Sequence, residues 1–156
     1  MPPGYTCVRN GNLTFGPEAI FHRGASFGAR IAALHNTDFV AMTFVDGGEL
    51  FVVIGSRGSE GDWLWGQPLA YTTSADQGHN FLNRVVALDH EAFALAFRDH
   101  LGRATAVIGL LQPAALEFSL GCEHYVFTQA FEELDMAVLG STSRIVFVQV
   151  IGRGPR

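Results

Sequence analysis

The sequence predicts an all-β protein built from three copies of one unit of about 50 residues. Two sets of matches carry this prediction. Identical residues recur at a shift of 54, and they are Leu34 with Leu88, Phe39 with Phe93, and Ile54-Gly55 with Ile108-Gly109. At a shift of 50, residues 12–21 (NLTFGPEAIF) lie over residues 62–71 (DWLWGQPLAY). Self-similarity at such a period indicates a supersecondary unit that is copied and packed beside its neighbours.

Turn residues divide the chain into short apolar runs. Gly, Asp, Asn and Ser recur every 8 to 12 residues, a spacing typical of all-β proteins. In the first unit the predicted strands are 12–21, 30–34, 38–44 and 49–55. In the second unit they are 63–71, 84–88, 92–97 and 103–111. The segments 9–12, 46–48 and 100–102 carry the Asn-Gly, Asp-Gly and Leu-Gly pairs that favour tight hairpins.

Two segments have apolar residues at helical spacing, namely residues 90–101 and 131–139. The first aligns with residues 36–47, which are rich in β-branched and aromatic residues and end in Asp-Gly-Gly. Copies of one unit should adopt one structure. The sequence therefore predicts strands in both segments.

The third copy is incomplete at its C-terminal side. Residues 116–118 and 125–127 match the two halves of the first strand, 135–139 match the second, and 144–150 match the third. The missing fourth strand is matched instead by residues 5–10, close to the N-terminus. We therefore expect a single domain over 1–156 with repeats at about 12–55, 62–111 and 115–150, and with strand 5–10 closing the last repeat, since an unpaired strand edge exposes a row of backbone N–H and C=O groups.

The repeats resemble the blades of β-propeller proteins. The pattern is carried by Ala33-Leu34, Phe39-Val40-Ala41 and Phe44-Val45-Asp46 in one copy, and by Ala87-Leu88-Asp89 and 93–99 in the next. The resemblance implies four-stranded blades over almost the whole chain, but no particular activity. No Asp-x-Asp-x-Asp-Gly loop of the calcium-binding propeller repeats is present. Three blades fall short of the usual minimum of four, so three arrangements stay open: a six-bladed ring of two chains, a threefold β-trefoil or β-prism, or part of a larger propeller.

Composition limits the function classes. Hydrophobic residues make up 48% of the 156 residues and charged residues 16%, which excludes disorder. All ten basic residues are Arg, so Schiff-base chemistry and a P-loop Lys are excluded. A net charge of −5 without an Arg cluster argues against a nucleic-acid partner. No apolar run reaches the roughly 18 residues of a membrane span and no signal peptide is visible, which leaves the localisation open.

The candidate ligand contacts lie in loops. The longest inserted loop is residues 72–83 (TTSADQGHNFLN), and insertions that vary between repeats often map to a binding face. The candidate ligand-binding residues are Asp76, Gln77, His79, Asn80, Asp99 and His100. The same end of the units would also gather His22 and Asp46, but no pair has the spacing of a metal motif, so no metal or other cofactor is expected. Trp63 and Trp65 align with core positions, although exposed indoles would make a platform for sugars.

The sequence favours a non-catalytic module over an enzyme. No G-x-S-x-G elbow or matched Cys–His setting is present. We expect a binding or scaffolding module that presents a rigid β surface to a protein partner or to a second copy in a homodimer. The alternative is a carbohydrate-binding lectin with a glycan as ligand. Cys7 and Cys122 are expected either to form one bridge or to be small buried hydrophobes.

Overall fold

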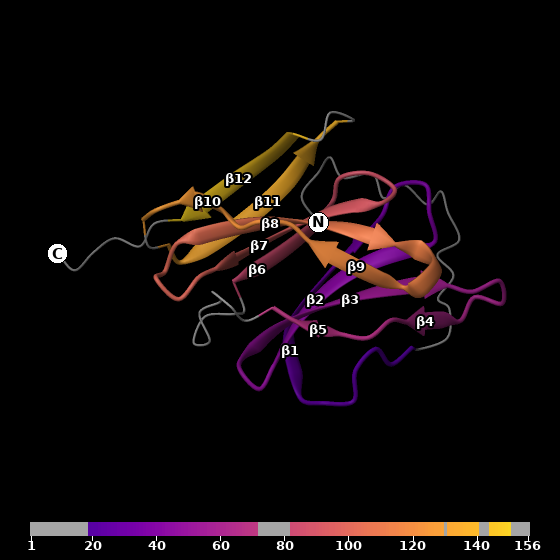
Figure 1. The fold of residues 1–156 in the computed structure, drawn as a ribbon. Helices are drawn as coiled ribbons and strands as arrows, with labels where there is room; N and C mark the ends of the chain where they lie inside the picture. Colours follow the sequence, from indigo (N-terminus) through magenta and orange to yellow (C-terminus); the bar gives the residue numbers. More distant parts are fainter. Residues whose placement is uncertain (1–18, 72–81, 130, 141–143, 151–156) are drawn as a thin grey trace, which may run out of the picture.

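The computed structural model describes residues 19–71, 82–129, 131–140 and 144–150, and all later structural statements concern these residues. The prediction of an all-β protein is confirmed. Strands form three antiparallel sheets of five, five and two strands, none of which closes on itself. Within the described residues the only helical element is the short 3-10 turn Pro113–Ala115. Figure 1 shows the three sheets as layers, with the second sheet between the first and the last.

The first sheet has the strand order β1-β2-β3-β4, and β5 pairs with an earlier part of β3 on the same edge as β4. Its strands are β1 (Ser26–Ala33), β2 (Phe39–Asp46), β3 (Glu49–Arg57), β4 (Trp63–Trp65) and β5 (Leu69–Ala70). The turn between β2 and β3 has Gly47 and Gly48 at φ of 58° and 85°. Because glycine adopts such values at no steric cost, the Asp-Gly-Gly pattern makes the tight hairpin that the sequence predicts.

The second sheet repeats this order, and a two-stranded hairpin follows it. The strands of the second sheet are β6 (Asn83–Ala87), β7 (Ala92–Arg98), β8 (Ala104–Gln112), β9 (Glu117–Leu120) and β10 (His124–Phe127), with β9 and β10 both paired to β8. The hairpin consists of β11 (Glu133–Leu139) and β12 (Arg144–Val150). The segments with helical spacing contain β7 and β11, so the prediction of strands there is confirmed.

Two cores hold the three layers together. The first core lies between the first and second sheets and is built from aliphatic residues of one and aromatic residues of the other, including Val45, Val52, Phe93 and Phe97, all fully buried. The second core lies between the second sheet and the hairpin. There the second sheet contributes small residues, among them Ala94 and Ala96, and the hairpin contributes Leu134 and Met136. Small side chains on one layer let the larger ones of the next approach closely.

A buried polar contact fixes the first two sheets relative to each other. The Thr43 hydroxyl donates a hydrogen bond of 2.6 Å to Asn83 Oδ1, and Asn83 Nδ2 donates one of 3.2 Å to the Gly28 carbonyl. Thr43 and Asn83 are both fully buried. Since a buried polar group without a partner destabilises the fold, this contact favours one alignment of the two sheets over others.

The hydrogen bonds correct one detail of the predicted alignment. The Leu34 N–H bonds the Phe39 carbonyl, whereas the Leu88 N–H bonds the Ala92 carbonyl. The structural counterpart of Phe39 is therefore Ala92, and that of Val40 is Phe93. The reason is that the connection after Leu88 is one residue shorter, which a constant shift of 54 conceals.

The sheets are also divided differently from the predicted repeats. Residues 63–71 are expected to begin the second unit, but β4 and β5 pair with β3 and thus complete the first sheet. In the same way β9 and β10 complete the second sheet on β8. Pro68, which has no backbone N–H, interrupts the predicted strand between β4 and β5. The closing strand 5–10 lies outside the described residues, and the propeller, trefoil and prism arrangements stay predictions.

The matched glycines Gly55 and Gly109 allow an aromatic ring to lie on the strand. The Trp65 ring covers Gly55, and the Phe93 ring covers Gly109, each from the neighbouring strand. A Cβ atom at either glycine would overlap the ring. This close approach explains why Ile-Gly recurs at a shift of 54.

We predict that Gly109→Ala destabilises the protein by about 1–3 kcal/mol, because the buried Phe93 ring must leave its position. Urea unfolding followed by circular dichroism measures the change. Gly121→Ala is the matched control, since the nearest atom to its Cβ is the Ile108 carbonyl oxygen at 3.5 Å, an ordinary contact. Equal stability of the two variants would contradict the packing described.

Candidate functional site

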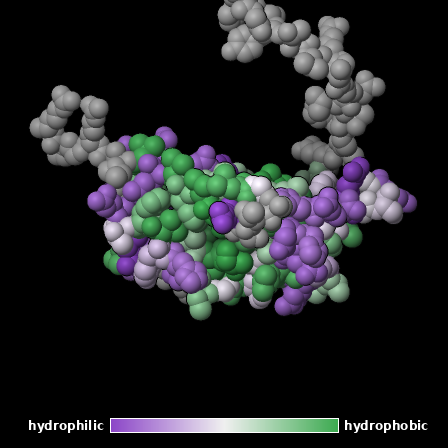
Figure 2. Space-filling view, turned by 90° about the horizontal axis from the view of Figure 1, so that it is seen from above, coloured by the Kyte–Doolittle hydropathy of each residue, from purple (hydrophilic) through white to green (hydrophobic). Residues whose placement is uncertain are grey.

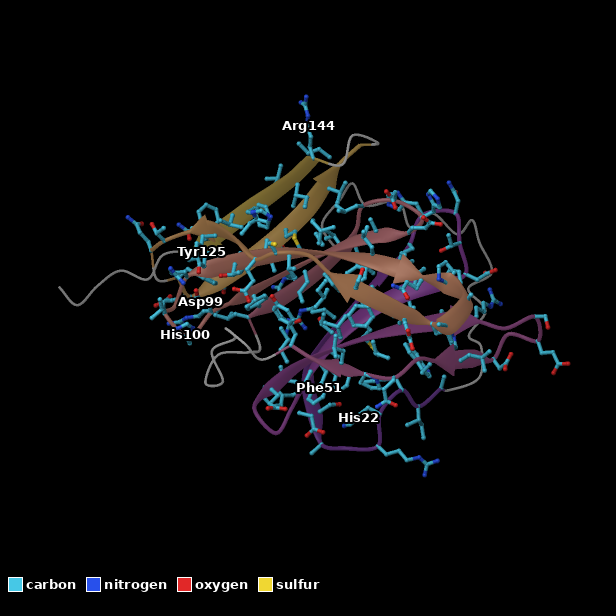
Figure 3. All side chains as sticks on the ribbon, in the orientation of Figure 1. His22, Phe51, Asp99, His100, Tyr125 and Arg144 are labelled. Carbon is cyan, nitrogen blue, oxygen red and sulfur yellow. The ribbon has the colours of Figure 1, made fainter. Side chains whose placement is uncertain are left out.

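The predicted loop residues fall into two groups. Asp76, Gln77, His79 and Asn80 lie outside the described residues, so their role as ligand contacts stays a prediction. Asp99 and His100 lie in the connection between β7 and β8, on the left in Figure 3. His100 is exposed, whereas Asp99 is fully buried.

The Asp99 carboxylate organises its own loop. It accepts hydrogen bonds from the N–H groups of Leu101 (2.9 Å) and Arg103 (2.8 Å), and its other oxygen lies 2.7 Å from the Arg103 guanidinium. Burial raises the pKa of the Asp99 carboxyl, but the Arg103 N–H, the Arg103 guanidinium and the Leu101 N–H outweigh it, so the pKa lies below its ordinary value. Arg103 in turn lies 3.8 Å above the Tyr125 ring. Asp99 has no exposed surface and its carboxylate supports its own loop. The role of Asp99 and of the exposed His100 as ligand contacts stays a prediction.

His22 and Asp46 form a separate contact on the first sheet. His22 Nε2 lies 2.6 Å from Asp46 Oδ2, and the imidazole lies over the Phe44 ring at a centroid distance of 4.9 Å. Figure 3 places His22 beside Phe51, away from His100. The pair fastens the segment before β1 onto the sheet. The structure therefore brings together His22 with Asp46, and Asp99 with Arg103, but does not join the two pairs into one site.

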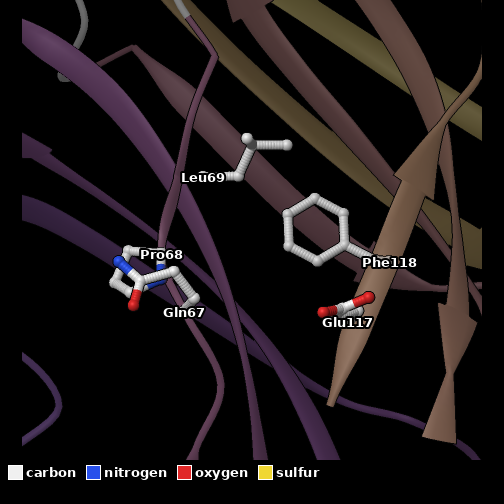
Figure 4. Close-up of a pocket in the computed structure, with 5 residues that line it drawn as sticks. All are labelled: Gln67, Pro68, Leu69, Glu117 and Phe118. Atoms are coloured by element: carbon white, nitrogen blue, oxygen red, sulfur yellow. The ribbon is translucent and has the colours of Figure 1, made fainter. Parts of the chain in front are cut away.

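A groove of about 210 Å³ lies between the first and second sheets, where the chain leading to β5 faces β9. Its lining residues, drawn in Figure 4, are Gln67, Pro68, Leu69, Glu117 and Phe118. Glu117 is the only ionisable group among them. Nearby, the Tyr71 hydroxyl donates a 2.8 Å hydrogen bond to Glu123. Burial and the Glu123 carboxylate raise the pKa of Tyr71, which therefore stays a neutral donor.

A second hollow, of about 200 Å³, lies at the end of the first sheet beside Trp63. Asp38, Arg57 and Thr37 contribute to its lining. Trp63 stacks on Trp65 at a centroid distance of 5.7 Å and is half-buried. Trp63 thus lines the same hollow as a carboxylate, a guanidinium and a hydroxyl. The expectation that both Trp residues are core residues holds for Trp65, which packs on the buried Phe44 and Val53, better than for Trp63.

The described residues also bear on three further features: a metal site, a membrane-spanning helix and the state of the cysteines. In that part of the chain no group of three or more His, Cys, Asp or Glu side chains is arranged to hold a metal ion. Across the same ranges, no helix has the length and apolar character needed to cross a membrane. Cys122 is exposed with a free thiol, so the expectation of burial is wrong for this residue. Cys7 lies outside the described residues.

An unusual feature of the described surface is the side of the hairpin that faces away from the second sheet. We call it the outer hairpin face, and its residues are Ala137, Leu139, Val146, Val148 and Val150. Leu139 and Val148 are 53% and 56% exposed. Figure 2 looks onto the molecule from the hairpin side and shows apolar residues gathered there, with polar ones around them. Asp135, Glu133 and Arg144 lie on the same side of the hairpin, opposite Val148, Val150 and Leu139 respectively, and are exposed as well.

The sequence analysis missed this face, although a signal was present. Strand β12 (RIVFVQV) is apolar on both sides, as are β2 (FVAMTFVD) and β7 (AFALAFR). A strand of this kind is typical of a sheet that is covered on both faces. Nearly all of β2 and β7 is buried, whereas every second residue of β12 is exposed. Comparison of the matched strands therefore identifies a strand whose second cover is absent from the described residues.

Comparison with known proteins adds no functional assignment, because no protein-family model, curated protein or solved structure matches this chain.

We predict that Asp99→Asn lowers the free energy of unfolding by about 1–3 kcal/mol at neutral pH, because charge-assisted hydrogen bonds to a buried carboxylate are lost. Since the pKa of folded Asp99 is depressed, its contribution is present above the ordinary Asp pKa and disappears as the pH falls through the folded value. Urea unfolding between pH 7 and pH 2 measures both effects.

Asp135→Asn is the control for this measurement. The Asp135 side chain is 73% exposed and pairs with Arg84 at 3.0 Å, so its loss should cost less than about 1 kcal/mol. An Asp99→Asn effect that is equally small, or that does not depend on pH, would contradict the structural role of Asp99.

Proposed function

We propose that this chain is a non-catalytic protein-interaction module that binds a partner through the outer hairpin face. The observation that carries the proposal is the exposure of alternate residues on β12, a strand whose two matched counterparts are buried on both sides. Contiguous exposed apolar surface with a polar margin is typical of protein interaction sites. A β surface of a partner that docked here would cover the exposed apolar side of β12.

The outer edge of β12 supports the same function. Among the described residues β12 pairs only with β11, so no described strand bonds the N–H and C=O groups of its other edge. Natural edge strands usually carry Lys, Pro, a bulge or inward charges that discourage pairing. Over its seven residues β12 has a single charge, Arg144 at one end, and its pairing with β11 is regular. Such a strand is suited to accept another β element.

The described titratable groups support binding over catalysis. Asp99 is engaged by its own loop, and the Asp89 carboxylate accepts 2.7 Å hydrogen bonds from the N–H groups of Glu91 and Ala92. Those N–H groups, that of Glu91 first, lower the pKa of Asp89 despite its exposure. Groups held in the charged form by their own turns serve the fold. A general acid or base needs a pKa near the working pH.

We predict that a photo-reactive benzoylphenylalanine at position 148 cross-links to one defined protein in cells that express the full chain. The same residue at position 64 is the control, because Leu64 is 54% exposed but lies on β4, away from the hairpin. The identified protein should then bind the purified chain, and Val148→Glu should weaken this binding at least about tenfold, since a carboxylate would be buried without a partner. Equal cross-linking at positions 148 and 64 would contradict the proposal.

A lectin is the second candidate, favoured by the hollow beside Trp63. The hollow is lined by an indole together with the polar groups of Asp38, Arg57 and Thr37. An aromatic ring and a few polar groups are the combination that fixes a small ligand in a pocket.

The lectin hypothesis predicts that the wild-type chain binds to glycans on an array. Trp63→Ala should reduce this binding signal at least about tenfold. Leu64→Ala, on the opposite side of the same strand, should leave the signal unchanged. An array without specific binding would exclude the lectin function and leave the protein-interaction proposal intact.

A further inference from the structure

We propose that the partner on the outer hairpin face is a second copy of this chain, which docks with the outer face of its first sheet. The reciprocal contact forms at the same time, so that two chains close a ring of six stacked units with one twofold axis. This inference rests on the proposed function and names its partner. The outer face of the first sheet carries Ile31, Met42, Phe44, Phe51 and Val53. Met42, Phe44 and Val53 are already buried beneath the partly buried Phe21, Phe51 and Trp65, so the accessible part of this face consists of these three aromatic residues and Ile31, which is 60% exposed.

The argument begins with the equivalence of the layers. Two sets of matched residues lie on the side of their sheet that faces the next unit. The first set is Leu34, Leu88 and Leu139, and the second is Ala41, Ala94 and Val146. In the first sheet Leu34 is 2% exposed and Ala41 is fully buried, because the second sheet covers them. In the hairpin the matched Leu139 is 53% exposed and Val146 is 39% exposed. The same face thus lacks its cover at one end of the stack.

The other end of the stack carries the complementary face. Phe44 of the first sheet matches Phe97 of the second, on the side that faces the preceding unit. Phe97 packs against Tyr71, and the ring centroids are 5.1 Å apart. Phe44 packs in the same way against Phe21, at 5.2 Å. Phe21 and Tyr71 match in the sequence, and Tyr71 directly follows β5, the outermost strand of the preceding sheet.

This equivalence indicates that the outer face of the first sheet is suited to pack against a preceding unit. A difference in exposure shows that no such unit covers the whole of this face among the described residues. Ile31 is 60% exposed, whereas its match Val85 is 7% exposed because the first sheet covers it. The outer hairpin face and the outer face of the first sheet therefore correspond to the two halves of one interface. Within the chain this interface occurs twice, between the first and second sheets and between the second sheet and the hairpin.

A second copy fits these halves better than the chain itself. The second sheet lies between the first sheet and the hairpin, so that the two incomplete faces point away from each other at opposite ends of the stack (Figure 1). One chain cannot join them without separating its own layers. Two chains related by a twofold axis join both pairs at once, and a heterologous contact that closes forms a ring and not a filament.

The inner strands are arranged as a ring requires. Strand β1 lies beside β6, and β6 lies beside β11, so the first strands of the three units follow one another around a common line. Arg30, Arg84 and Asp135 hold matched positions on these strands. Arg84 lies 3.0 Å from Asp135, and Arg30 lies near enough for its charge to act on the same carboxylate. Six such units around one axis agree with the geometry of closed propellers.

The test uses one exposed residue from each half-interface. In the full chain, Val148→Glu alters the hairpin half and Ile31→Glu alters the first-sheet half, and sedimentation equilibrium measures association. Wild type is expected to be a dimer. In either variant both interfaces contain one Glu, so the dissociation constant should rise at least about a hundredfold. Leu64→Glu is the control and should stay dimeric, and circular dichroism checks that each variant is folded.

Mixing the two variants distinguishes this interface from others. A mixed pair has one interface without any Glu, so an equimolar mixture should form dimers at concentrations at which each variant alone is monomeric. If Ile31→Glu stays dimeric while Val148→Glu does not, two hairpins pack against each other and the proposed pairing is wrong. A monomeric wild type would overturn the second copy as partner, and cross-linking of position 148 to a different protein would then leave the proposed function standing.

Discussion

The structure depends on the packing of strands that are apolar on both faces. Strands β2 and β7 are apolar and buried at nearly every position, so each needs packed side chains on both of its faces. The second sheet meets this requirement fully, because the first sheet covers one side and the hairpin the other. Burial of this kind contributes about 25 cal/mol per Å² of apolar surface. The stacking of layers, more than any single contact, therefore determines the fold.

Specific contacts decide how the layers are aligned. Apolar packing is not directional, so the polar contact between Thr43 and Asn83 has the greater influence on alignment, because a shift of one sheet would leave both groups buried without partners. A second link of the same kind is the 3.1 Å hydrogen bond from the His35 N–H to the Asp89 carbonyl, which joins matched turns of the two sheets. Both contacts join the first sheet to the second.

Much of the fold was predictable from the sequence, since turns such as Asp46-Gly47-Gly48 and the alternation of apolar residues are local signals. The division into sheets was not. Residues 63–71 carry the same apolar pattern whether they begin one sheet or complete another, and only hydrogen bonds to β3 decide between these possibilities. The register of Ala92 depends on a connection one residue shorter, which the repeated identities do not reveal.

The candidate site was less predictable than the fold, for a related reason. Sequence reasoning looks for polar groups in loops, and so it selected Asp99, whose carboxylate is turned inward to bind its own loop. The outer hairpin face consists of residues such as Val146 and Val148, which look like core residues in the sequence. Only their exposure distinguishes them, and exposure depends on whether a further layer is present.

In a repeat protein the interior units satisfy each other, so that unsatisfied surface collects at the two ends. Natural repeat proteins commonly protect these ends with polar capping units. Neither end of this stack has such a cap among the described residues: Leu139 and Val148 are exposed at one end, and Ile31 at the other. If the two ends associate as we propose, the interface between chains resembles the two contacts that already hold the layers of one chain together. The proposed function therefore depends on the incomplete layers at the ends of the stack.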